Sequence, residues 1–324
     1  MELRALSPDD APALRRCFRR CYGDTYPAAE FYDLEKLRRR LQDGTLRSVA
    51  AVAGSGEVVG HTALSVRHPH AFVAEAGNTV VDPAYRGRGL LRELGLMLAE
   101  RCRADGFNGF VHYPTTAHEV MQKASVKGGG IETGVMLGYV PATADYRGMD
   151  DKRPVGRLAA TVVYQAIRPL PNRDVVLVER YSGILKELYA ALGAEPVFDT
   201  RRRPPRGQFS IRTAHSAGEG IVRHTVAMIG ADLGDLIVAT SRTHGTLPVT
   251  LVDLPLGDPG IDHAVNALTR SGFFYCGLLP GFGAGDVLRL QRLDENASDI
   301  ARPVLANPGA QRLLAYIDAD RVTS

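Results

Sequence analysis

The 324-residue sequence contains no tryptophan and only four cysteines, Cys17, Cys21, Cys102 and Cys276. No two of them form a C-x-x-C pair, so the sequence lacks the common signatures of disulfide exchange and of zinc fingers. Histidine and acidic residues also lack the spacing of metal ligands, and we expect no metal. The cysteines are therefore expected to be reduced packing residues of a cytoplasmic protein.

Long hydrophobic runs and a strong charge imbalance are also missing. No stretch of about 18 apolar residues occurs, so we expect no membrane-spanning helix and no membrane partner. The first ten residues, MELRALSPDD, carry acids and no apolar run, so we expect no signal peptide. A net charge of +3 is too small to indicate nucleic-acid binding. The length and the 45% hydrophobic content suit two globular domains.

The most informative stretch runs from Ala74 to Leu98 and reads as a strand, a glycine turn and a helix. The strand is expected to stop before Pro83, because proline lacks the N–H group that a sheet needs. Gly87 and Gly89 allow a turn in which several N–H groups point into one concavity. The helix that follows directs its positive end to the same place. This arrangement predicts a site for an anion with several oxygens, such as a pyrophosphate.

Two familiar phosphate-binding motifs do not match this turn. A dinucleotide fold requires G-x-G-x-x-G, but Gly87-x-Gly89 leads to Arg92. A P-loop requires Gly-Lys-Ser/Thr, which is absent. The pattern V-x-P-x-Y-R-G-x-G-L instead resembles motif A of the GNAT acyltransferases. That resemblance implies binding of the pyrophosphate of acetyl-CoA, or of another acyl-CoA, as a co-substrate.

The order of predicted elements extends the resemblance. Residues 1–141 read as β, α, α, three antiparallel strands, α, β, α, β, which is the order of a GNAT domain. The second half ends in the same way, with a helix, a glycine turn and a strand that stops at a proline. We therefore predict an α/β (α+β) protein of two GNAT-like domains, 1–150 and 151–324, each a mixed, mostly antiparallel sheet flanked by helices. A strand at 158–167 is expected to begin the second domain.

The second domain is expected to be degenerate. It has only Ile229-Gly230-Ala231 where the glycine loop of the first domain would recur. We therefore expect it to frame the acceptor site and not to bind acyl-CoA. The arginine-rich loop at 201–206 is either a solvated loop or a clamp for an anionic acceptor.

The resemblance also assigns the residues that hold the co-substrate. In the GNAT family the strand before motif A and the next strand splay apart, and pantetheine lies between them. Backbone groups of Val80 and Val81 would then hold the pantetheine and the acyl carbonyl. The pyrophosphate would contact the N–H groups of a five-residue segment, with a guanidinium of one of its arginines as a further contact: Arg86, Gly87, Arg88, Gly89 and Leu90.

The sequence leaves alternatives open for the general base and the general acid. Glu75 lies on the key strand near the place where several GNAT enzymes carry a general base, and the alternative is a carboxylate that satisfies local N–H groups. The usual general acid of the family is a tyrosine, but Val126 occupies its position. Ser125, Tyr113 and His118 are the possible substitutes.

These features together predict an N-acyltransferase, most simply an N-acetyltransferase that moves acetyl from acetyl-CoA to a small-molecule amine by direct attack. The chain is expected to be a monomer or a homodimer. One alternative is a non-enzymatic acyl-CoA sensor or scaffold, which the missing tyrosine leaves open. The other is an aminoacyl-tRNA-dependent transferase, which would be expected to lack the glycine loop and to have a basic surface.

Overall fold

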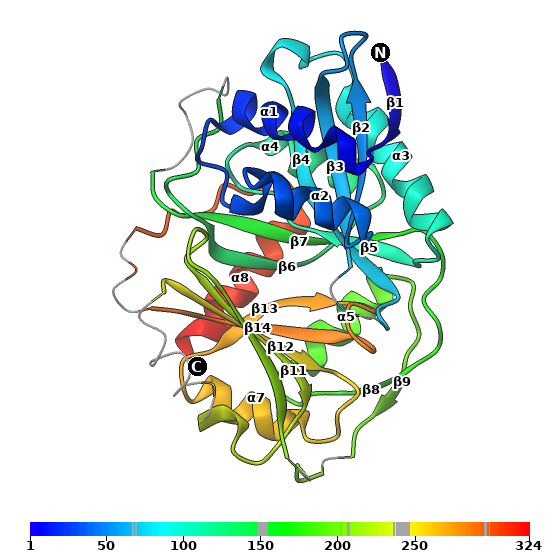
Figure 1. The fold of residues 1–324 in the computed structure, drawn as a ribbon. Coiled ribbons are helices and arrows are strands. Elements are labelled where there is room, and N and C mark those ends of the chain that lie inside the picture. Colours follow the sequence, from blue (N-terminus) through cyan, green and yellow to red (C-terminus); the bar gives the residue numbers. More distant parts are fainter. Residues whose placement is uncertain are drawn as a thin grey trace.

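The computed structural model describes the chain except Arg67, Pro69, 148–154, Arg202, Arg206, Gly207, Leu236, 238–246, Glu295, Asn296 and Ser298. One mixed sheet of twelve strands runs through both halves of the described chain (Figure 1). Its strand order is β1-β2-β3-β4-β5-β7-β6-β13-β14-β12-β11-β10. A small parallel pair, β8 and β9, lies apart from this sheet.

The first half supplies the strands from β1 to β7. Their bounds are β1 Glu2–Ala5, β2 Leu46–Val52, β3 Val58–Ser65, β4 Val73–Val81, β5 Gly109–His112, β6 Ile131–Val140 and β7 Leu158–Ala166. Its helices are η1 Pro8–Asp10, α1 Ala11–Tyr22, η2 Ala29–Phe31, α2 Leu34–Gln42, η3 Pro83–Tyr85, α3 Leu90–Ala104 and α4 Glu119–Lys127.

The second half supplies the remaining strands and a long terminal helix. The strands are β8 Asp174–Val176, β9 Val197–Asp199, β10 Ser210–Ser216, β11 Ile221–Met228, β12 Val249–Pro255, β13 Phe274–Leu279 and β14 Val287–Leu293. The helices that the structure describes in full are α5 Ser182–Ala191, α7 Ile261–Thr269 and α8 Pro308–Val322. The sequence also predicts a helix at 232–241, and this segment falls partly outside the described residues.

The two halves repeat one strand topology. In the first half β3 and β4 are antiparallel, β4 and β5 parallel, and β7 pairs antiparallel with both β5 and β6. In the second half β10, β11, β12, β14 and β13 take the same places with the same directions. The predicted fold class, mixed and mostly antiparallel sheets flanked by helices, is confirmed.

The strand that we expected to begin the second domain lies inside the first sheet. Leu158–Ala166, which is β7, pairs with β5 on one side and with β6 on the other. This pairing was not predictable from the sequence, because β7 follows a polar linker and its order in the sheet differs from its order in the chain. A division into two domains stays a proposal, and the pairing favours a boundary after β7 instead of after residue 150.

Helices cover both faces of the first sheet. The amphipathic helices α1 and α2 bury apolar side chains, among them Leu14, Phe18 and Leu37, against one face (Figure 1). Helix α3 packs Leu98 and Cys102 against the other face. Helix α8 closes the junction by packing on β6 and β13. No helix in the described part of the chain is long and apolar enough to cross a membrane.

Candidate functional site

Strands β4 and β5 separate partway along their length. They pair from Val73 opposite Gly109 to Ala76 opposite His112, and β5 ends there. Within the described chain, the last five residues of β4, from Gly77 to Val81, have no partner on that side. A strand edge that has lost its neighbour presents N–H and C=O groups that a ligand can bind. Val80 and Val81 lie on this free edge, and their contacts with the pantetheine and the acyl carbonyl stay predictions.

A bulge at Asn78 bends β4 at the splay. Asn78 has a φ of 56°, and among the described residues it is the one non-glycine with a positive φ. The Tyr26 hydroxyl donates to its side-chain oxygen at 2.9 Å, and a ring nitrogen of His61 lies 2.8 Å from its carbonyl. Asparagine tolerates this left-handed conformation better than most residues. The bend is thus held by two neighbouring elements, α1 with its loop and β3.

The glycine loop after β4 has the geometry of an anion site. Gly87 and Gly89 have φ values of 74° and 79°, and a Cβ on either would meet no atom within 4 Å. No acceptor within the described chain bonds to the N–H groups from Gly87 to Leu91. These amides and the positive end of α3 therefore form an open site suited to a pyrophosphate.

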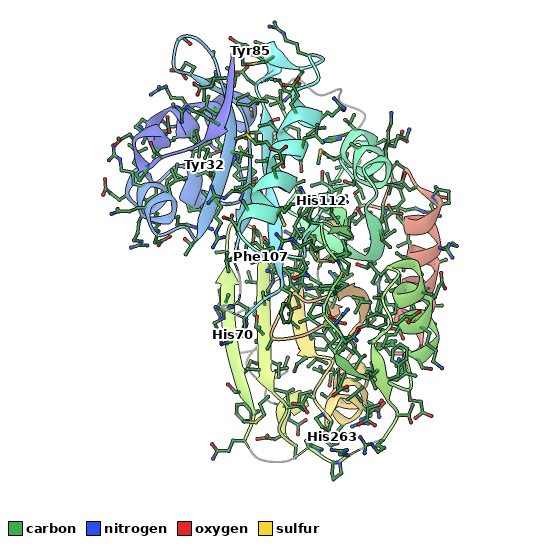
Figure 2. The ribbon with its side chains drawn as sticks, turned by 90° about the vertical axis from the view of Figure 1, so that its right-hand side faces the viewer. Tyr32, His70, Tyr85, Phe107, His112 and His263 are labelled. Carbon is green, nitrogen blue, oxygen red and sulfur yellow. The ribbon has the colours of Figure 1, made fainter. Side chains whose placement is uncertain are left out.

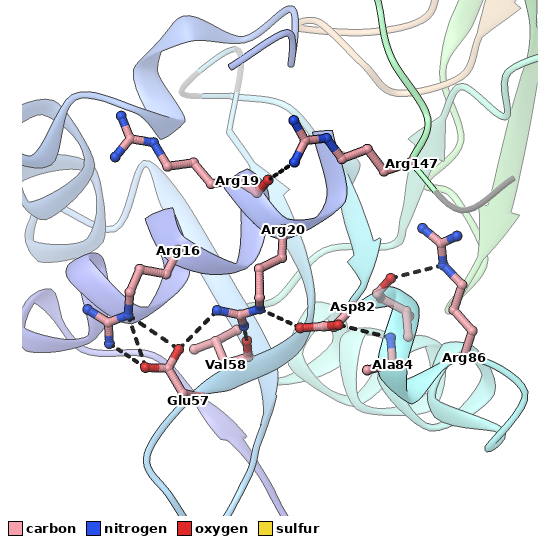
Figure 3. Close-up of polar contacts among 10 residues, drawn as sticks. Arg16, Arg19, Arg20, Glu57, Val58, Asp82, Ala84, Arg86 and Arg147 are labelled. Atoms are coloured by element: carbon pink, nitrogen blue, oxygen red, sulfur yellow. Dashed lines mark hydrogen bonds and ion pairs between the residues drawn. The ribbon is translucent and has the colours of Figure 1, made fainter. Parts of the chain in front are cut away.

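An ion-pair network fixes the start of this loop (Figure 3). Asp82 accepts from the N–H of Ala84 at 3.0 Å and from Nε of Arg20. Arg20 also donates to Glu57 at 3.1 Å and to the carbonyl of Val58 at 2.6 Å. Charge-assisted contacts of this kind are stronger than neutral hydrogen bonds. The network ties α1, β3 and the glycine loop together, and so it positions the anion site.

The two loop arginines contact the loop's own backbone. Arg86 donates from Nε to the carbonyl of Val81 at 3.2 Å (Figure 3). Arg88 donates to the carbonyl of Ala84 at 3.1 Å, and its guanidinium lies 4.9 Å from the ring centroid of Tyr85. Arg88 is exposed and Arg86 half-buried. Neither assignment as a phosphate contact is tested by this geometry, and both stay predictions.

Glu75 lies on β4 at the junction of the two halves. Its carboxylate is buried and lies 3.9 Å from Nη1 of Arg223, which comes from β11 of the second half. Arg223 also donates to the hydroxyl of Tyr139 on β6 at 3.4 Å. The second half therefore supplies a cation, Arg223, beside the Glu75 carboxylate, and the sequence alone did not predict this contact.

A second arginine reaches across the same junction. Arg289 on β14 is fully buried and forms a bidentate pair with Asp253, at 2.6 and 2.8 Å. It also donates to the hydroxyl of Tyr113 at 3.0 Å. Burial raises the pKa of Tyr113, and Arg289 opposes that rise. The rings of Tyr113 and Tyr139 lie 5.7 Å apart, so the two arginines and two tyrosines form one polar cluster.

The other candidate acids lie on or beside α4. Ser125 is buried and donates to the carbonyl of Met121 in its own helix at 2.7 Å. His118 precedes the helix, and burial, with Arg86 nearby, lowers its pKa. Its Nδ1 is buried with no hydrogen-bond partner in the described chain. Val126 is 38% exposed. Nothing in this geometry selects one acid, so Ser125, Tyr113 and His118 stay predictions.

In the described part of the second half, the place that matches the glycine loop is filled by other groups. Asp258 accepts from the N–H group of Ile229 at 2.9 Å and from that of Gly260, at the start of α7, at 2.8 Å. A Cβ on Gly230 would lie 2.8 Å from the backbone nitrogen of Phe209. A carboxylate and a neighbouring chain segment thus occupy the space that is open in the first half. A phosphate there would meet negative charge.

The described part of the basic loop lies among second-half elements. Arg201 forms a bidentate pair with Asp199 at 2.9 Å, and Pro205 packs near Gly260 at the start of α7. Arg202 and Arg206 lie outside the described residues. The arginine that lies beside Glu75 is Arg223 instead. Sequence reasoning missed it because 148 positions separate the two residues, and only the sheet topology brings them together.

Comparison with known proteins agrees with the fold and the loop. Residues 11–123 match the sequence profile described as the acetyltransferase (GNAT) family. A comparison with curated proteins gave no significant match.

Several solved structures are similar to about half of the chain. An N-acetyltransferase from Staphylococcus aureus Mu50 is 14% identical, with a TM-score of 0.42 over 52% of this chain and 98% of the other. A phosphinothricin acetyltransferase from Sinorhizobium meliloti in complex with AcCoA is 20% identical, with a TM-score of 0.40 over 52% and 88%. An aminoglycoside 6'-N-acetyltransferase complexed with coenzyme A is 16% identical, with a TM-score of 0.39 over 53% and 100%.

These likenesses are too distant to indicate a substrate. The profile match runs from the start of α1 into α4 and includes Glu75, strand β4 and the glycine loop. Residues 11–123 are therefore similar to a GNAT acetyltransferase domain, and this similarity supports an acyltransferase.

Proposed function

We propose that this protein is an acyl-CoA-dependent N-acyltransferase that moves an acetyl group from acetyl-CoA to the amine of a small molecule. The observation that carries the proposal is the pairing of an open anion site, from Gly87 to Leu91, with the free edge of β4. The pyrophosphate binds at the loop, and the pantetheine amides bond to the strand edge. This placement brings the thioester to the region of Val80 and Val81.

The amine attacks the thioester carbonyl directly. Glu75 accepts a proton from the ammonium, directly or through water, so that the nitrogen lone pair is free. A backbone N–H at Val80 or Val81 stabilises the oxyanion of the tetrahedral intermediate. As the C–S bond breaks, the nitrogen of the intermediate loses its second proton to water or to the departing sulfur, and the products are the amide and CoA. The main contribution of the protein is orientation, since it turns a bimolecular reaction into one within a complex.

The thiolate needs little help to leave. An ordinary thiol has a pKa of about 8.5, so a thiolate is a stable leaving group near neutral pH. Ser125, Tyr113 and His118 are candidates to return the proton. The Tyr113 hydroxyl accepts from Arg289 and keeps its own proton available for donation.

Two alternative functions make different predictions. A non-enzymatic acyl-CoA sensor would bind the co-substrate without consuming it. An aminoacyl-tRNA-dependent transferase would not use the glycine loop, whereas the loop here is intact and geometrically open. The open loop therefore favours acyl-CoA as the donor over an aminoacyl-tRNA, and it does not separate an enzyme from a sensor.

Turnover distinguishes these functions. The full-length protein is incubated with acetyl-CoA and a library of small amines, and release of the free CoA thiol is followed. We expect amine-dependent release and an acetylated product one acetyl group heavier by mass spectrometry. Tight binding of acetyl-CoA without release on any amine would favour the sensor.

A further inference from the structure

The two arginines at the junction of the two halves are not equally paired. The guanidinium of Arg289 has a bidentate carboxylate partner, Asp253, at hydrogen-bond distance. Arg223 lies in the same cluster, but its nearest described carboxylate oxygen is that of Glu75 at 3.9 Å. Its single described hydrogen bond, to Tyr139, is long at 3.4 Å.

The Nε atom of Arg223 is the clearest sign of an incomplete site. It is buried and has no hydrogen-bond partner among the described residues. The side chain as a whole is 19% exposed. Burying a cation without partners for its donors is costly, and a structural role would favour a partner like Asp253. A guanidinium can bind a carboxylate through two parallel hydrogen bonds, and such a ligand would supply the partner that Nε of Arg223 lacks.

The distance between the Arg223 guanidinium and the Glu75 carboxylate indicates how far apart the charged groups of a bound ligand would be. Their closest charged atoms are 3.9 Å apart. In an α-amino acid the amine nitrogen and the nearer carboxylate oxygen are separated by roughly 3 Å, from standard bond lengths. Such a zwitterion can place its ammonium at Glu75 and its carboxylate at Arg223, and it adds no net charge to the buried cluster.

We propose that the acceptor is an α-amino acid or a molecule with that end group, and that Arg223 of the second half binds its carboxylate while Glu75 of the first half receives the ammonium. This inference rests on the proposed function and names its acceptor class. It also gives the second half a specific task, since that half contributes the residue that recognises the acceptor. Arg223 acts as a binding residue that touches substrate and takes no part in proton transfer.

The test compares matched amines with acetyl-CoA and the full-length protein. Each of a set of α-amino acids is paired with the amine that lacks its carboxylate, such as phenylalanine with 2-phenylethylamine and alanine with ethylamine. A third arm, 6-aminohexanoate, carries both groups at a longer spacing. We expect kcat/KM to be at least about 100-fold higher for the preferred α-amino acid than for its decarboxylated partner, the scale of one charge-assisted bidentate contact.

Variants at position 223 separate recognition from stability. Arg223→Met and Arg223→Lys should reduce this preference to less than about tenfold, mainly by raising the KM for the amino acid. The KM for acetyl-CoA should stay within about twofold. Arg312→Met removes an exposed arginine of the second half that pairs with Glu187 at 2.7 Å, and it should keep the preference.

The outcomes distinguish this inference from the proposed function. No CoA release with any amine, in any arm, would contradict the proposed function itself. Release that is equally fast with decarboxylated amines or with 6-aminohexanoate would overturn the α-amino acid assignment and leave the acyltransferase intact. An unchanged preference in a folded Arg223→Met or Arg223→Lys protein, as judged by its acetyl-CoA affinity, would overturn the role of Arg223.

Discussion

Gly134 of β6 and Gly277 of β13 lie directly opposite each other where the two halves of the chain join. Each strand has a register shift just before its glycine, so the two edges bend in the same way. The halves are thus related by an approximate two-fold arrangement with β6 and β13 at its centre. This contact makes one continuous sheet out of two GNAT-like topologies (Figure 1).

A side chain at position 134 should separate these strands. A Cβ on Gly134 would lie 2.0 Å from the carbonyl oxygen of Cys276, and both groups are backbone-anchored. Overpacking of this kind costs about 1–3 kcal/mol, so we expect Gly134→Ala to lower the free energy of unfolding by at least that amount. Urea unfolding measures the change. Gly285→Ala, where a Cβ meets no atom within 4 Å, should change it by less than about 1 kcal/mol.

The position of β7 predicts which fragments fold. A fragment of residues 1–150 lacks β7, so β5 and β6 lose the strand that lies between them. We expect this fragment to show no cooperative unfolding transition by circular dichroism and no acetyl-CoA binding. A fragment of residues 1–170 retains β7 and should unfold cooperatively. Cooperative folding of the shorter fragment, with full acetyl-CoA binding, would contradict the topology.

Acidification should destabilise the first half through two histidines. His61 is fully buried between Ser48 and the carbonyl of Asn78, and burial lowers its pKa to about 4. Burial also lowers the pKa of His112 to about 4, and the position of this residue is labelled in Figure 2. The unfolded chain binds more protons than the folded one between pH 6.5 and 4. The stabilisation is therefore complete above pH 6.5 and is lost as the pH falls toward 4.

Urea unfolding measures this dependence. Each histidine should lower the free energy of unfolding by about 2 kcal/mol between pH 6.5 and pH 5. In His61→Asn the slope with pH should fall by about half, whatever the stability of the variant at pH 7. An unchanged slope would show that His61 can take up a proton in the folded protein.

Removal of the Glu75 charge should affect chemistry more than binding. Glu75→Gln keeps the shape of the side chain but cannot accept a proton. We expect the acetyl-CoA affinity to stay and kcat to fall by roughly 100-fold near neutral pH, with partial recovery at high pH where the amine is already neutral. A pH–rate profile of the variant provides the measurement. Full activity across the pH range would remove Glu75 from the role of base.

Some parts of the fold and of the candidate site were predictable from the sequence and others were not. The glycine loop was predictable because Gly87, Gly89 and Pro83 are local signals, each tied to its own backbone requirement. The fold class followed from the order of elements. The place of β7 was not predictable from its sequence, because strand order in a sheet depends on pairing between distant segments. Arg223 was missed for the same reason, since its significance comes from Glu75 on another strand.

Asp82 provides a test of how the loop is held. It caps η3 at the N–H of Ala84 and pairs with Arg20 (Figure 3). Asp82→Ala removes both contacts, and we expect a loss of about 1–2 kcal/mol in the free energy of unfolding together with weaker acetyl-CoA binding. Thermal unfolding and calorimetry measure the two effects. Stability lost without any loss of affinity would show that the loop holds its shape alone.

Calorimetric titration of the full-length protein with acetyl-CoA tests whether the glycine loop binds the pyrophosphate. We expect one site per chain. Asparagine and aspartate are the side chains that best tolerate the left-handed backbone at position 89, where φ is 79° and the Cβ space is open. Gly89→Asp should therefore bind at least about tenfold more weakly than Gly89→Asn, because it places a negative charge where the pyrophosphate lies. Two sites per chain, or equal affinity of the two variants and the parent protein, would contradict the assignment of this loop.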